Sequence, residues 1–129
     1  MDEDRWRELV GRIEGDDVEQ MAEASEMLEK ESTADDIPRL LELLSHTDLV
    51  VREAAAWPLS IVGGPALLPK LFDAYQQAFD EGHDNDGFLA ALIQLVELRK
   101  DESRLVLAEL SASSNPIYRQ NAKWLSEFC

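Results

Sequence analysis

The sequence contains one cysteine among its 129 residues, Cys129, so no disulfide can form within the chain. The first residues, Met1–Asp4, are mostly acidic and do not show the basic and then apolar layout of a signal peptide. No apolar run approaches the ~20 residues that a membrane-spanning helix needs. We therefore expect a cytoplasmic protein with a reduced thiol and no membrane partner.

Basic residues are also scarce, because 12 lysines and arginines face 27 aspartates and glutamates. The resulting net charge of −15 repels nucleic acid and anionic membrane surfaces. This charge favours another protein with a basic surface as the partner.

Residue patterns typical of catalysis are missing as well. The two histidines, His46 and His83, lie in predicted turns or at helix ends. The sequence has no Gly-x-Ser-x-Gly elbow, glycine-rich phosphate loop, His-Glu-x-x-His or Cys-x-x-Cys. We therefore predict that the protein is not an enzyme and needs no cofactor.

The polar segment Asp84–Gly87 looks at first like a calcium-binding loop. An EF-hand loop with its invariant glycine at this position would begin at Gly82, which offers no carboxylate. We therefore predict no metal site here and expect Asn85 or Asp86 to cap the following helix.

Apolar residues with helical spacing fill most of the chain. Four alanines recur at spacings of 33, 35 and 32 residues, which is typical of stacked helical repeats. These alanines are Ala22, Ala55, Ala90 and Ala122. Turn signals separate eight helical segments, at Gly15–Asp17, Ser32–Asp35, Thr47–Asp48, Gly63–Pro65, Asp80–Gly87, Lys100–Asp101 and Ser113–Pro116.

The second helix pair resembles a short HEAT repeat, through Ile37–Leu44, then Asp48, then Val51–Ala55. The fourth pair repeats the pattern more loosely, through Asn115 and Tyr118–Ala122. The resemblance implies an all-α fold, a right-handed α-α superhelix of about four antiparallel helix pairs, forming a single HEAT-like domain over residues 1–129. The period also equals that of tetratricopeptide repeats, which we rank second because only the first pair fits their pattern.

In HEAT proteins a ladder runs along the corners of the helix pairs. There an Asp or Asn caps the second helix and meets an arginine of a neighbouring repeat. The resemblance assigns this structural role to Asp48 with Arg52 and to Asn115 with Arg119. The spacing of four residues also permits a local ion pair within each helix.

Residues 1–36 hold 14 acidic and 4 basic residues, a net charge of −10. Within them an acidic stripe at helical spacing comprises Asp16, Glu19, Glu23 and Glu26. Second helices of HEAT pairs line a concave surface, so the resemblance implies a partner-binding groove here, with a solvated face as the alternative. Trp57 and Trp124 lie on second helices and are either core residues or interface anchors.

These observations favour a non-catalytic protein-binding module, a scaffold or adaptor that uses an acidic concave helical surface. One alternative is suggested by size and charge: the chain resembles bacterial immunity proteins, which neutralise a cognate toxin by covering its basic surface. A second alternative is a HEAT-like enzyme such as a bilin lyase-type protein, which only the repeat pattern suggests.

Overall fold

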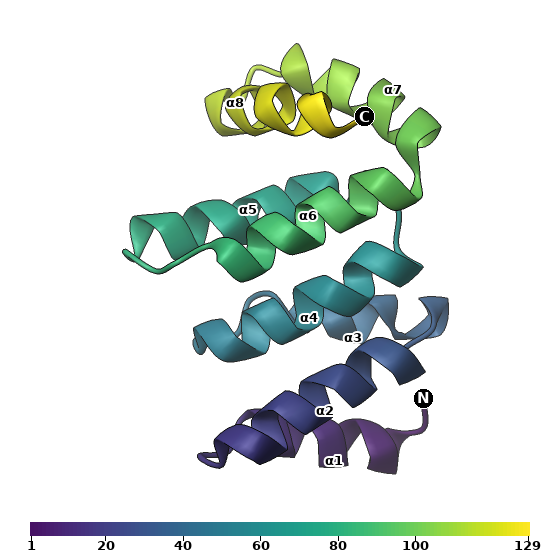
Figure 1. The fold of residues 1–129 in the computed structure, drawn as a ribbon, viewed down its shortest axis with the longest axis vertical. Helices are drawn as coiled ribbons and strands as arrows, with labels where there is room; N and C mark the ends of the chain where they lie inside the picture. The colour runs from purple at the N-terminus through teal and green to yellow at the C-terminus, as the bar shows by residue number, and fades with distance from the viewer. The chain divides into compact units, whose positions relative to one another are not determined.

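The computed structural model describes all residues from Met1 to Cys129 and contains helices without strands, which confirms the predicted all-α fold (Figure 1). The α-helices are α1 (Glu3–Ile13), α2 (Val18–Glu31), α3 (Ile37–Leu43), α4 (Leu49–Val62), α5 (Leu68–Asp80), α6 (Asp86–Leu98), α7 (Lys100–Ser111) and α8 (Pro116–Leu125). Short 3₁₀ turns are η1 (Ala34–Asp36), η2 (Pro65–Leu67) and η3 (Ser126–Phe128). None of these helices combines the length and the apolar character needed to span a bilayer.

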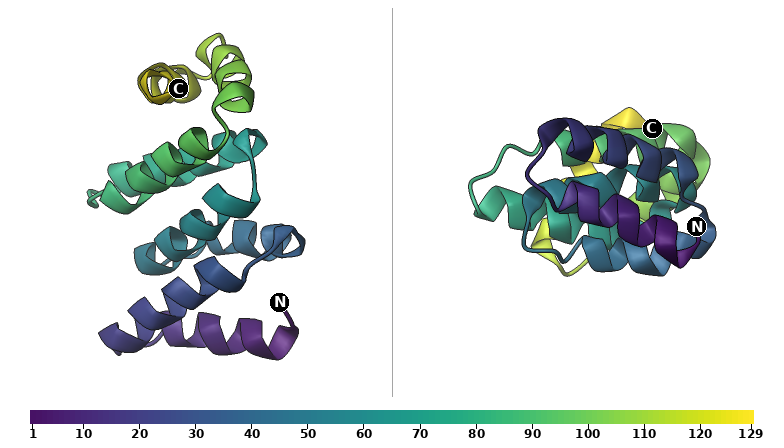
Figure 2. Two further views of the ribbon diagram at one scale, coloured as in Figure 1. Left: turned by 45° about the vertical axis from the view of Figure 1, so that its right-hand side comes forward. Right: turned by 90° about the horizontal axis from the view of Figure 1, so that it is seen from below.

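The chain divides into two compact units, unit 1 (Met1–Val62) and unit 2 (Gly63–Cys129). In unit 1, α2 packs against both α1 and α4, and α3 packs against α4 (Figures 1 and 2). In unit 2, α8 packs against α5, α6 and α7. Each unit thus consists of two helix pairs, as the turn signals predict. A single domain over residues 1–129 stays a prediction.

A polar side chain fixes the start of the second helix in every pair. Its oxygen accepts the backbone N–H of the residue two positions later, at 2.9–3.0 Å, which satisfies a donor that the helix leaves unpaired. We call these four side chains the cap residues: Asp17, Asp48, Asp84 and Asn115. Asn85 holds the N-cap position of α6, as expected, but its side chain makes no capping hydrogen bond, and the Asp84 carboxylate accepts the first N–H of the helix.

A buried alanine follows each cap residue by seven positions, and each is at most 1% exposed. These alanines are Ala24, Ala55, Ala91 and Ala122. A side chain of one carbon lets the neighbouring helix approach closely, so this position sets the rotation of the second helix. Two of the four alanines that define the sequence period do not occupy this packed position, because Ala22 is exposed and Ala90 is only half-buried.

The two arginines four positions after a cap residue make the same contact in both units. Arg52 Nη1 donates to the carbonyl oxygen of His46 at 3.3 Å, and Arg119 Nη1 donates to that of Ser113 at 2.9 Å. In each case the acceptor lies two residues before the cap residue, in the corner between the helices of a pair. The arginine therefore fastens the corner of its own pair.

A charged cluster in unit 1 surrounds Asp36, which has no exposed surface. Asp36 accepts hydrogen bonds from the Thr33 backbone N–H at 2.8 Å and from Arg39 Nη2 at 2.6 Å, and the Met1 ammonium lies 3.4 Å away. The Arg39 guanidinium lies 4.5 Å from the centroid of the Trp6 ring. Burial alone raises the pKa of Asp36, but the Thr33 and Arg39 hydrogen bonds and the ammonium charge bring it below the ordinary 3.8.

The orientation of α2 predicts that leucine at two nearby alanines will change the free energy of unfolding by different amounts. Ala24→Leu places three extra carbons in a packed contact and is expected to lower the free energy of unfolding by about 1–3 kcal/mol. Ala22→Leu lies on the exposed side and is expected to change it by less than about 0.5 kcal/mol. Urea unfolding of both variants checks this, and equal effects would contradict the register.

The Asp36 cluster predicts a stability difference that depends on pH. Asp36→Asn removes the buried carboxylate that accepts from Thr33 and Arg39 and faces the Met1 ammonium, while Arg39 keeps its ion pair with Glu3. We therefore expect it to lower the free energy of unfolding at pH 7 by about 1–3 kcal/mol. Because the pKa of Asp36 is lowered in the folded state, this stabilisation is present above pH 4 and is lost as the pH falls below the ordinary value. Unfolding at pH 7 and at pH 2 tests the trend, with the exposed neighbour Asp35→Asn as control.

Candidate functional site

Second helices turn one face toward solvent in both units. Residues two, five and nine positions after each cap residue are exposed or half-buried, because the alanine at position seven faces the interior. We call these positions the outer face. In unit 1 the outer face consists of Glu19, Ala22 and Glu26 on α2 and of Val50, Glu53 and Trp57 on α4.

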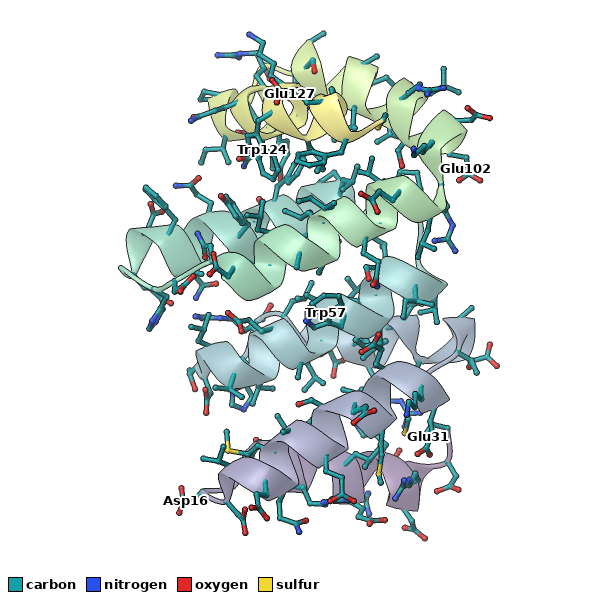
Figure 3. All side chains as sticks on the ribbon, viewed as in Figure 1. Asp16, Glu31, Trp57, Glu102, Trp124 and Glu127 are labelled. Atoms are coloured by element: carbon teal, nitrogen blue, oxygen red, sulfur yellow. The ribbon has the colours of Figure 1, made fainter.

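The four predicted acidic residues occupy three different settings. Glu19 and Glu26 lie on the outer face, where Glu26 forms an exposed ion pair with Lys30 at 3.0 Å. Glu23 is exposed at the edge facing α1 and lies 3.3 Å from Arg12 Nη2. Asp16 lies in the turn before α2 (Figure 3). The structure therefore brings the three glutamates together on α2 and leaves Asp16 beyond the helix.

Arginines of α1 reach across to α2 along that same edge. Arg5 forms two hydrogen bonds with the Glu31 carboxylate, at 2.9 and 2.7 Å, and a third contact with the Met27 sulfur at 3.2 Å. These hydrogen bonds raise the pKa of Arg5 and lower that of Glu31. Even so, unit 1 holds 17 acidic and 6 basic residues, a net charge of −11. The carboxylates of Glu23 and Glu31 therefore have arginine partners from α1, and Glu26 on the outer face has Lys30.

Apolar side chains border this acidic surface on α4. Trp57 is half-buried on the outer face of α4, and Val50 and Ile61 on the same helix are 40% and 36% exposed (Figure 3). Because α2 packs against α4, the outer faces of these two second helices belong to neighbouring helices. Tryptophan is among the residues that are enriched at the energetic centres of protein interfaces.

Trp124 belongs to unit 2, so the structure assigns the two predicted anchor residues to different units. Its ring contacts Tyr75, with centroids 5.9 Å apart, and its Nε1 donates to Asn121 Oδ1 at 2.9 Å. Beside it, between α5 and α8, lies a cleft of about 270 Å³. The cleft is lined by Tyr75, Gln76, Phe79, Gln120, Asn121 and Trp124.

Sequence reasoning missed most of this cleft. Tyr75 and Phe79 are four residues apart on α5, and Asn121 and Trp124 are three apart on α8, so each pair shares a helical face. The sequence shows these spacings within each helix, but only the packing of α8 against α5 brings the two faces together. The same two helices are linked by a hydrogen bond in which Tyr118 Oη donates to Asp73 Oδ1 at 2.8 Å.

The loop between α5 and α6 supplies a hydrogen-bond acceptor for the first turn of α6. Asp84 Oδ1 accepts the Asp86 N–H at 2.9 Å, which fully accounts for the polar run as a cap. No group of three or more His, Cys, Asp or Glu side chains is placed to hold a metal ion.

Comparison with known families decides the assignment. A family model of HEAT repeats matches residues 8–83, which is more than half of the chain. The chain belongs to the HEAT repeat family. No curated protein and no solved structure matches it significantly. The tetratricopeptide interpretation is set aside, because the matching model is that of HEAT repeats. HEAT repeats are in general scaffolds for protein interaction, and the family is generally non-catalytic.

The hydrogen bond between α8 and α5 of this HEAT protein predicts the titration of Tyr118. Burial and the neighbouring Asp73 carboxylate raise the pKa of Tyr118 above the ordinary 10.0. The Asp73→Asn variant lacks the negative acceptor but keeps the burial. The pKa of Tyr118 is therefore expected to fall part of the way toward the ordinary 10.0. Tyrosine ¹³Cζ chemical shifts against pH measure it. Asp80→Asn on the same helix serves as control, and an equal fall in both variants would contradict the assignment.

Proposed function

We propose that the protein is a non-catalytic binding module of the cytoplasm whose unit 1 outer face binds a basic surface of another protein. The observation that carries the proposal is the set of exposed carboxylates on α2, with Glu19 and Glu26 on the outer face and Glu23 at the edge that faces α1. Membership of a family of interaction scaffolds supports it.

Charge and apolar contact have separate tasks in this proposal. A surface with excess carboxylates attracts a cationic partner over a distance set by the ionic strength, about 8 Å at physiological salt. Such steering raises the association rate more than it slows dissociation. Trp57, with Val50 and Ile61, then offers the desolvated contact that holds the complex. We propose no role for nucleic acid or membranes.

Neutralisation of a toxin is the second candidate, and the same acidic surface supports it. A basic catalytic surface of a nuclease-like or similar toxin would fit an exposed patch of carboxylates, as in immunity proteins. The two candidates differ in what binding does. A scaffold leaves its partner active, whereas an immunity protein inhibits a toxic activity at a one-to-one ratio.

The three glutamates provide the test. Glu19, Glu23 and Glu26, all changed to Gln, are expected to slow association with the partner by about tenfold at low salt, because three steering charges are lost. The partner is the protein that the immobilised chain retains from its native cell extract. Surface plasmon resonance at two salt concentrations measures the rates.

A matched variant removes the same charge from unit 2. Glu97, Glu109 and Glu127 are exposed, and their joint change to Gln is expected to alter the association rate by no more than about twofold. Circular dichroism verifies that both variants fold, since exposed ion pairs such as Arg12–Glu23 contribute at most about 1 kcal/mol. Equal effects of the two variants, or none from the first, would refute steering by α2.

A further inference from the structure

The cleft between α5 and α8 has the chemistry of a binding site of its own. Phe79 lines the cleft and is 65% exposed, so its ring is open to a ligand. Its neighbours in the cleft are the rings of Tyr75 and Trp124, and the remaining lining residues are uncharged amides. Trp124 extends from α8 toward α5, so its ring forms one wall of the cleft (Figure 3).

One of the residues that line this cleft has a buried hydrogen-bond donor without a partner. Asn121 is only 5% exposed, and its Nδ2 has no acceptor within the protein. The orientation of this amide is fixed, because the indole Nε1 of Trp124 can only donate and therefore faces Oδ1. A buried donor left unsatisfied is costly, so a ligand that brings an acceptor to Nδ2 gains from it.

The electrostatics favour a cationic ligand group. Aromatic faces carry partial negative charge and attract lysine and arginine side chains within about 6 Å of the ring centroid. Unit 2 holds 10 acidic and 6 basic residues, and no basic side chain lines the cleft. Gln76 Nε2 donates to Asp80 Oδ1 at 2.9 Å, so the remaining amide atom of Gln76 is an oxygen that can accept from an ammonium group.

We propose that this cleft binds a basic side chain of a partner protein. The cation lies against the rings of Trp124 and Phe79, and a main-chain carbonyl beside it accepts a hydrogen bond from Asn121 Nδ2. Neither contact involves the outer face of unit 1. This inference therefore stands or falls separately from the proposed function.

Nuclear magnetic resonance of the ¹⁵N-labelled full chain tests it. The probes are the blocked tripeptide glycyl-lysyl-glycine amide and its neutral isostere with norleucine. We expect the lysine peptide to shift both the Trp124 Nε1–H and the Asn121 Nδ2 signals, with a dissociation constant about tenfold lower than that of the norleucine peptide. The n-butylammonium ion, which lacks a carbonyl, should shift the Trp124 signal alone.

Two exposed phenylalanines serve as a matched pair of variants. Phe79→Ala removes a wall of the cleft and should weaken the lysine peptide by roughly fivefold. Phe128→Ala removes a ring that contacts Trp124 from outside the cleft, with centroids 6.5 Å apart, and should change binding by less than about twofold. Equal binding of norleucine and lysine peptides, equal effects of both variants, or unchanged Trp124 and Asn121 signals at millimolar peptide would overturn the proposal.

Discussion

Close approach of the two helices in each pair depends on an alanine seven positions after the cap residue. The cap fixes where the second helix begins, and the alanine fixes which side of it faces the first helix. Together they leave the helix no freedom to rotate. Positions two, five and nine must then face solvent, so the outer face is a consequence of how the pair closes.

The position of the cap residue locates the packed alanine of each repeat better than the spacing between alanines does. Helices, turns and family could be predicted from apolar periodicity and from Asp48, Arg52 and Ala55. A near-constant alanine period points to Ala22 and Ala90, but it assumes first helices of equal length. The first helix α5 has 13 residues whereas α3 has 7, and the exposed Ala22 lies only two residues before the buried Ala24. The cap residue accepts the backbone N–H of a residue only two positions later. Its separation from the packed alanine is therefore seven residues in every pair.

Long-range contacts account for what the sequence did not reveal. Asp36 reads as one more acidic residue in a turn, and only the folded chain brings the Met1 ammonium to 3.4 Å from its buried carboxylate. The acidic stripe likewise divides only once α1 is in place, since Arg12 faces Glu23 while Glu19 and Glu26 lie on the outer face of α2. Both results depend on which helices pack together, and residue spacing along one helix carries no such information.

Position nine after the cap residue shows how one scaffold carries different chemistry. It holds Glu26, Trp57, Ile93 and Trp124 in the four pairs. Because this position faces away from the packed alanine, its side chain can vary without disturbing the pairing of the helices. At Trp124 the side chain also meets Tyr75 of α5 and uses Asn121 to hold its indole, so an outer-face residue becomes the wall of a cleft. The unpaired Nδ2 of Asn121 follows from that arrangement, since the same amide cannot turn to satisfy Nδ2 without releasing the indole. The features that favour a ligand are therefore added at positions on which the scaffold itself does not depend.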